Sequence, residues 1–246
     1  MTTHQNRPSP VDYLERDLAC LKFTRRYGIC LTSTLSEVFF GGKDATHVLP
    51  KLVEKNWITR HARKIPGGLS YGTLTPQGLK VIGLECKEAT PPTGVSLNIS
   101  VALSWYCCLE VFRRFRLLPE EITRLLGKRV PSNVPHILDN SATGPVVLRV
   151  YHSLGQVSAT KGPVEEFFDA ANNRPSVAAW VAAQQYGLLV LCPTREKAAQ
   201  VNAFLERKGL LAHGRLIVGL GPTTETLSRY LCERKAANGE DRTRPA

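Results

Sequence analysis

Apolar residues in the first third of the chain recur at helical spacing. Leucines at positions i, i+4 and i+7 predict a first helix over 11–27. Similar spacing predicts a second helix from about Thr32, whose hydroxyl we expect to cap it, and a third helix from about Asp44. Pro50 interrupts the third pattern, because proline removes a backbone donor. The third helix therefore either begins near His47 or is bent.

A β-hairpin and a fourth helix follow these three helices. Two β-prone runs, 58–64 and 69–74, flank a Pro-Gly-Gly turn. Thr75 and Pro76 then supply a helix cap and a first helical residue. Three helices followed by a hairpin predict a winged helix-turn-helix domain over 11–85.

The pattern changes after residues 86–97, which contain Thr-Pro-Pro-Thr-Gly and are predicted to form a linker. Mixed helical and strand-like runs predict a small α/β mixed-sheet domain over 98–235, so we expect the α+β class. The apolar run 187–192 is typical of a strand buried on both faces. We expect a flexible tail over 236–246 because its composition is mainly polar and it lies at the end of the chain.

The start of the second domain predicts a long helix and then two strands. An apolar run predicts a helix from about Ile99 to Phe115. The strands are predicted over 135–138 and 145–151, and Asp139 falls in the connection between them. Asp-Asn before a serine is typical of a turn, so a turn-capping role is one interpretation of Asp139.

Charge indicates an anionic partner. The 246-residue chain has a formal net charge of +11 and a pI of about 9.5. Residues 22–64 hold nine Lys or Arg side chains against three acids, which favours double-stranded DNA as the partner. The predicted DNA contacts lie on the third helix and the hairpin: Lys43, Thr46, His47, Lys51, Arg60, His61, Arg63 and Lys64.

A second group of basic residues falls in the second domain. It is either a solvated face or a second DNA surface. Its members are Arg113, Arg114, Arg116, Lys128, Arg129 and Arg149.

Several classes of protein are disfavoured by composition. No apolar run is long enough to span a membrane, and the first residues lack a secretory signal pattern. Seven scattered cysteines without a CxxC pair argue against a disulfide framework or a zinc site. His136, Asp139 and His152 are of metal-ligating types but lack a supporting spacing. We therefore expect a cytoplasmic protein without metal, cofactor or catalytic residues.

Several stretches together resemble the plasmid replication-relaxation family over roughly residues 11–210. The first is "LPKLVEKNWITRHARKIPGGLSYGTLTPQGL", and the second domain adds "LLPEEITRLLGKR", "HILDN" and "GPVVLRVYHSLG". The resemblance implies a protein of plasmids or other mobile elements, linked to DNA replication, mobilisation for conjugation, or their control. We expect the second domain to pair two subunits as a homodimer or to contact a replication or conjugation protein.

The resemblance further implies a restriction-endonuclease-like second domain. An active version has an Asp at the end of one strand and a Glu-x-Lys type motif on the next, and these carboxylates hold Mg²⁺. Asp139 matches the first position, but Arg149 replaces the acid and Tyr151 replaces the lysine. We therefore expect a DNA-binding regulator or accessory factor of replication, mobilisation or transcription. The alternatives are a divergent Mg²⁺ nuclease that uses Asp139 with Glu165 or Glu166, and a protein–protein adaptor that binds no DNA.

Overall fold

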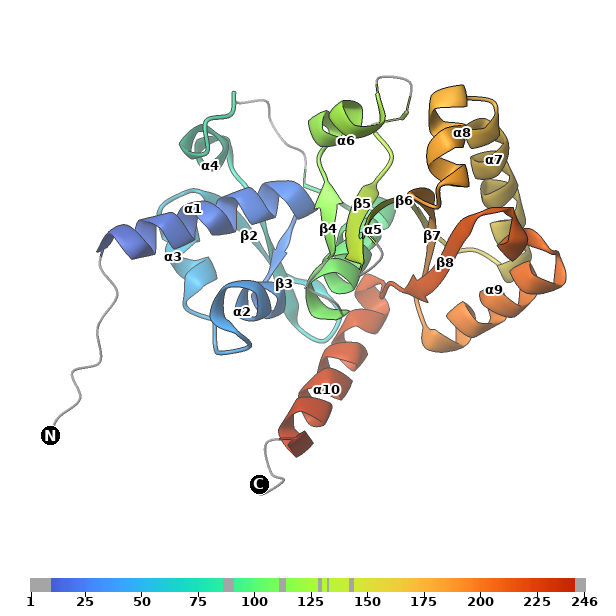
Figure 1. Cartoon of the computed structure of the whole chain (residues 1–246). Coiled ribbons are helices and arrows are strands. Elements are labelled where there is room, and N and C mark those ends of the chain that lie inside the picture. Colours follow the sequence, from blue (N-terminus) through green and yellow to red (C-terminus); the bar gives the residue numbers. More distant parts are fainter. Residues whose placement is uncertain are drawn as a thin grey trace, which may run out of the picture. The chain divides into compact units, whose positions relative to one another are not determined.

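The computed structural model describes residues 10–85, 91–110, 114–127, 130–131, 133–141 and 144–241. The chain divides into two compact units, Met1–Pro92 and Thr93–Ala246 (Figure 1). The division falls within the predicted linker, and the residues from Gly94 onward already belong to a helix. One unit contains a three-stranded sheet and the other a five-stranded mixed sheet, so the fold is α+β.

Among its described residues, the first unit has four helices and three strands. Its elements are α1 (Pro10–Tyr27), β1 (Cys30–Leu31), α2 (Thr32–Phe40), α3 (Val48–Glu54), β2 (Ile58–Ile65), β3 (Leu69–Leu74) and α4 (Pro76–Val81). The sheet has the order β1-β3-β2 and is antiparallel throughout. Leu21, Leu35, Leu52 and Ile58 are fully buried and form part of the core of this unit.

Helix starts in the first unit follow local chemistry, with one correction. Thr32 does not cap α2, because it is the first residue of the helix and Leu31 occupies the N-cap position. The Thr34 hydroxyl accepts from Leu31 N at 3.2 Å and donates to Leu31 O at 2.8 Å. α3 begins at Val48, so Pro50 lies in its first turn, where no helical N–H bond is lost. Of the two alternatives predicted for this helix, the start near His47 is therefore correct, and the bend is not needed. Thr75 caps α4 as predicted, by accepting from Gly78 N at 3.0 Å.

Close packing around Gly72 joins the sheet of the first unit to α3. A Cβ atom on Gly72 would lie 2.7 Å from a side-chain carbon of Ile58 and 2.8 Å from side-chain atoms of both Cys30 and Leu49. Real Cβ atoms essentially never make such contacts. Only glycine therefore fits at this point of β3 without moving its neighbours.

The second unit contains a five-stranded sheet with helices on both faces. Its elements are α5 (Gly94–Ser104), the π-helical segment η1 (Trp105–Glu110), β4 (Arg114–Leu117), α6 (Pro119–Leu126), β5 (His136–Ser141), β6 (Gly144–His152), η2 (Val157–Thr160), α7 (Lys161–Asn172), α8 (Pro175–Ala182), β7 (Tyr186–Cys192), α9 (Arg195–Arg207), η3 (Leu210–His213), β8 (Arg215–Leu220) and α10 (Thr224–Asp241). The order is β4-β5-β6-β7-β8; the first three strands are antiparallel, and β6, β7 and β8 are parallel.

The two faces of this sheet have different covers. Helices α6, α7, α8 and α9 contribute to one apolar core, in which Phe167 and Leu188 are almost fully buried. On the other face Tyr106 of η1 lies against Gly219, and Ala102 of α5 lies against Gly221. β7 is buried along its whole length, as its apolar run predicts.

Three predictions for the second unit are wrong. The helix predicted to reach Phe115 ends earlier, and Arg114–Leu117 form the edge strand β4 instead. Asp139 lies inside β5, opposite Val146 of β6, so it does not cap a turn. α10 continues to Asp241, so the first residues of the predicted flexible tail are helical.

Candidate nucleic-acid interface

The outer face of α3 carries part of the predicted DNA-contact set. Val48, Leu49 and Leu52 are buried against the unit. His47 and Lys51 are one helical turn apart and both are exposed, as are Lys43 and Thr46 in the preceding loop. These four predicted residues therefore all lie on the surface, next to a helix that is anchored by its apolar side.

Asp44 organises the loop that leads into α3. Its carboxylate accepts from Thr46 N and from Thr46 Oγ1, both at 2.9 Å. The backbone bond from Thr46, followed by its hydroxyl bond, lowers the pKa of Asp44 below its usual range. The His47 ring meets Phe40 edge-on, with centroids 5.8 Å apart. Thr46 already donates its hydroxyl proton, so it can offer an incoming ligand only an acceptor.

The hairpin carries a bulge at its basic residues. His61 pairs with Tyr71 and Ile65 with Leu69, so residues 62–64 of β2 stand opposite Ser70 alone. Arg63 has a φ of 53°, in the left-handed region that residues other than glycine seldom adopt. Such backbone positions recur at binding sites. Regular strand pairing is therefore interrupted at residues 62–64, and all three of these residues are exposed.

Ser70 connects the bulge to the strand. Its hydroxyl lies 3.4 Å from both Arg63 N and an Arg60 guanidinium nitrogen, as an acceptor for each. The side chains of Arg60, Arg63 and Lys64 are exposed. None of these three has an acidic partner among the ion pairs of the described residues. We call them the hairpin cations.

His61 differs from the other predicted contacts because it packs onto the hairpin itself. Its ring stacks on Tyr71 with centroids 4.6 Å apart, and Nε2 is hydrogen-bonded to Thr73 Oγ1 at 2.9 Å. Burial, together with the charge of Lys64, lowers the pKa of His61. The ring is therefore neutral near neutral pH and contributes to the hairpin's packing.

One ion pair missed by the sequence analysis ties α1 to the turn after α3. Lys55 Nζ lies 2.7 Å from Asp17 Oδ2, and Lys55 also lies over the Trp57 ring at 4.6 Å. The Asp17 side chain is only 5% exposed. Lys55 is one of the nine basic residues of this segment, but its charge is already neutralised within the unit. The 38-residue separation of the two partners hides this pair from a local reading of the sequence.

The second basic group is not one surface. Arg114 and Arg116 alternate along β4 with Phe115 and share one face, on which Arg114 contacts Asp139. Arg149 lies opposite His136, and His136 lies opposite Leu117. Because Leu117 follows Arg116 directly, its side chain is on the other face of the sheet, and so is that of Arg149. Three further members, Arg113, Lys128 and Arg129, lie outside the described residues.

Arg114 is engaged in contacts inside the second unit. Its guanidinium lies 3.0 Å from Asp139 Oδ2 and 3.1 Å from Glu110 Oε2, and it stacks over the Tyr106 ring at 4.0 Å. Its side chain is 13% exposed. Burial raises the pKa of the neighbouring Glu110 carboxyl. Arg114 therefore neutralises two carboxylates and has little surface for a phosphate.

The positions of the expected nuclease motif do not converge. Asp139 and Arg149 lie on opposite faces of the sheet, and Tyr151 shares the face of Arg149 because it stands two residues further along the same strand. The residue opposite Asp139 on β6 is Val146. The carboxylate of Asp139 therefore faces an arginine and an apolar neighbour in the place where a second acid would be needed.

The three residues of metal-ligating type are used for hydrogen bonds or ion pairing. His136 Nδ1 donates to Val134 O at 2.8 Å, so Nε2 of the neutral ring accepts from the Tyr186 hydroxyl at 3.0 Å. Burial lowers the pKa of His136 to about 4. His152 Nε2 donates to Gly221 O at 3.0 Å. Within the described ranges, no group of three or more His, Cys, Asp or Glu side chains could hold a metal ion.

In the part of the chain that the structure describes, no helix is long and apolar enough to cross a lipid bilayer. No family model, no curated protein and no solved structure matches this chain.

Proposed function

We propose that this chain is a duplex-DNA-binding regulator or accessory factor of a plasmid or other mobile element. The first unit binds the DNA as a winged helix-turn-helix domain. The observation that carries the proposal is the set of hairpin cations: Arg63 and Lys64 are exposed at the bulge, Arg60 is exposed on the regular part of β2 before it, and none has an acidic partner among the described ion pairs. Cations held on a short hairpin are suited to the phosphates that flank a groove.

The order of elements in the first unit supports the winged-helix assignment. A helix and a short strand precede two helices, and a hairpin follows them, with β1 paired beside β3. α3 is anchored by buried leucines and exposes His47 and Lys51, and an exposed helix face of this kind is suited to a major groove. The resemblance to the plasmid replication-relaxation family supports the link to mobile elements.

The second unit acts as a scaffold for a partner rather than as a nuclease. Its mixed sheet with helices on both faces supports a restriction-endonuclease-like architecture. Asp139 is paired with Arg114, and Arg149 lies on the other face, which supports a role without metal chemistry. The process served is replication, mobilisation or transcription of the element.

A binding titration tests the proposal. Fluorescence anisotropy is measured with a random duplex and with a duplex from the region upstream of the gene. We expect binding by the wild-type chain and its loss in the double variant Arg63→Glu, Lys64→Glu. The matched control Lys208→Glu, Lys235→Glu makes the same change of charge at exposed positions of the second unit and should retain binding. Equal affinity of the hairpin variant and the wild type would refute the assignment.

A further inference from the structure

The strand β8 is an unprotected edge of the five-stranded sheet. It pairs only with β7 among the described residues, and its residues Leu216 to Leu220 are all uncharged and, apart from Gly219, carry apolar side chains. The stretch from Arg215 to Gly219 is half-buried. An edge strand presents a row of backbone N–H and C=O groups that can pair with another strand.

The two edges of the same sheet differ in how they limit such pairing. Proteins usually protect an edge with charged side chains, proline or a bulge. β4, the other edge, has Arg114 and Arg116 in a four-residue strand. β8 has one charge, at its first residue, and its register with β7 is regular over all six positions. The composition and regularity of β8 therefore favour pairing with a further strand.

A cavity borders the carboxyl half of β8. Its volume is about 580 Å³, and its walls include Val218 and Leu220 of β8, Trp105 of η1 and Tyr230 of α10. Trp105 is 6% exposed, and its indole N–H has no acceptor among the described residues. Buried donors usually have a partner, and π-helical turns such as η1 occur frequently at functional sites. The cavity thus offers room and an unused donor beside the open edge.

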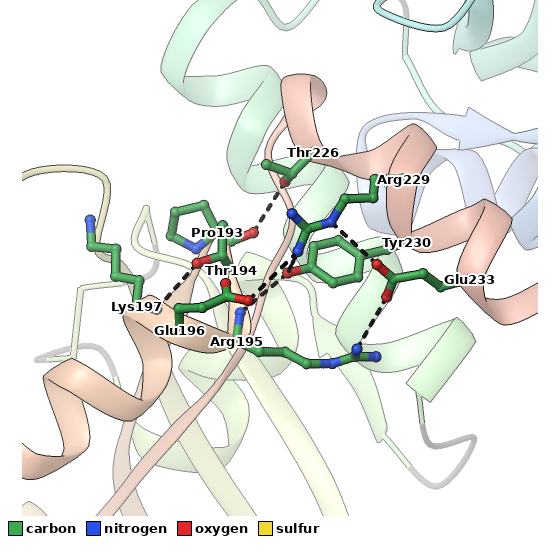
Figure 2. A network of polar contacts seen from close by, with 9 residues as sticks. All are labelled: Pro193, Thr194, Arg195, Glu196, Lys197, Thr226, Arg229, Tyr230 and Glu233. Atoms are coloured by element: carbon green, nitrogen blue, oxygen red, sulfur yellow. Dashed lines mark hydrogen bonds and ion pairs between the residues drawn. The ribbon is translucent and has the colours of Figure 1, made fainter.

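Arg195, Tyr230 and Glu233, which line this cavity, belong to a network of polar contacts that joins α9 to α10 (Figure 2). The Glu233 carboxylate of α10 forms two ion pairs: Oε2 lies 3.1 Å from Arg195 Nη1 of α9, and Oε1 lies 3.3 Å from Arg229 Nε. The Tyr230 hydroxyl accepts from Arg195 N at 3.2 Å, so the start of α9 is tied to α10. A cavity wall held in this way needs little reordering when a partner arrives.

We propose that β8 pairs antiparallel with β8 of a second copy of this chain, about a two-fold axis, to form one continuous ten-stranded sheet. In such a pair, the first residues of one strand lie opposite the last residues of the other, and only the residues in the middle lie close to the axis. Arg215, the only charged residue of β8, therefore lies opposite the uncharged far end of the other strand. At that far end, Leu220 lines the same cavity as Glu110, whose carboxylate is opposite in charge to Arg215.

The composition of β8 favours pairing with a second copy of the same strand over pairing with an unrelated peptide. The apolar positions of β8 match an apolar strand of the same length, and a second copy supplies that strand. The pairing goes beyond the proposed DNA binding, because it concerns the second unit and does not depend on the hairpin cations.

Salt dependence separates this association from DNA binding. Each copy has a net charge of +11, so two copies repel each other at long range. Salt screens that repulsion but leaves the apolar and backbone contacts of β8 intact. The dimer should therefore become tighter as salt rises, whereas binding to DNA becomes weaker.

The test uses the full chain at increasing concentrations. Five of the described cysteines are buried and Cys232 is exposed, so a Cys86→Ser chain can be labelled at Cys232. We expect energy transfer between donor- and acceptor-labelled chains, a dimer mass in sedimentation equilibrium, and stronger association at higher salt. Hydrogen exchange of the β8 amides should slow as concentration rises. A chain that stays monomeric at every concentration and salt, or a dimer without that protection, overturns the proposal.

A variant pair locates the interface. Ile217→Lys places like charges close to the two-fold axis and should weaken dimerisation at least tenfold. Leu125→Lys adds the same charge at a 40% exposed position on α6 and should dimerise as the wild type does. Circular dichroism checks that both variants are folded. If the folded Ile217→Lys chain dimerises as tightly as the Leu125→Lys chain, the β8 edge is not the interface. If it does not fold, the exchange measurement on the unmodified chain still decides.

Discussion

Neutralising the hairpin cations should reduce the salt dependence of DNA binding by a defined amount. The triple variant Arg60→Gln, Arg63→Gln, Lys64→Gln removes the three charges but keeps polar side chains, and the backbone N–H of residue 63 can still donate to Ser70. Each lost phosphate contact lowers the slope of log affinity against log salt by about 0.9, so three contacts lower it by about 2.7. Over a rise from ~50 mM to ~200 mM salt, the wild type should therefore lose about 40-fold more affinity than the variant does.

The assay is an anisotropy titration of one duplex across a salt series. A matched triple control, Lys80→Gln, Lys208→Gln, Lys235→Gln, removes the same charge from exposed positions elsewhere. If net charge alone drives binding, the control and the hairpin variant will change the slope equally. Equal slopes for wild type and hairpin variant would refute the reasoning, because they would mean that the three cations release no counterions from DNA.

Two predictions concern stability. Gly72→Ala puts a methyl group within 2.8 Å of Ile58, Cys30 and Leu49, and overpacking of this kind should lower the free energy of unfolding by about 1–3 kcal/mol in urea denaturation; a loss below ~0.5 kcal/mol would contradict it. Burial lowers the pKa of His136 from 6.5 to about 4, so the unfolded chain takes up this proton first as pH falls. The wild type should then lose about 3 kcal/mol between pH 6.5 and 4 that a His136→Gln chain does not lose. A stability difference between the two chains that stays constant over this range would contradict the buried neutral state.

Short-range patterns predicted most of the first unit. The cap Thr75 followed by Pro76, and the two runs around the Pro-Gly-Gly turn, depend on neighbours within a few residues, and the structure has both the capped helix and the hairpin. The bulge at Arg63 could not be read in this way, because it depends on which residues of β3 pair with His61 and Ile65. The same holds for Lys55, whose partner Asp17 lies on another helix.

The second unit shows where local patterns fail. The run that ends at Phe115 is apolar at helical spacing, yet Arg114 to Leu117 pair with residues of β5 that are 19 to 25 positions away in sequence. Pairing across that distance overrides a local helical preference. The π-helical segment has no signal in composition or spacing that distinguishes it from the α-helix before it.

The placement of Asp139 shows that residues with the spacing of a motif form a site only if their side chains lie on the same face of the sheet. In sequence, Asp139 and Arg149 lie on successive strands, as the two halves of a nuclease motif do. The pleat turns alternate side chains to opposite faces, and the observed register sets Asp139 against Val146. A shift of one residue in that register would have brought Asp139 and the face of Arg149 together. The observed register instead places Arg114 beside the carboxylate, so the charge that a metal would balance is balanced by the chain's own guanidinium.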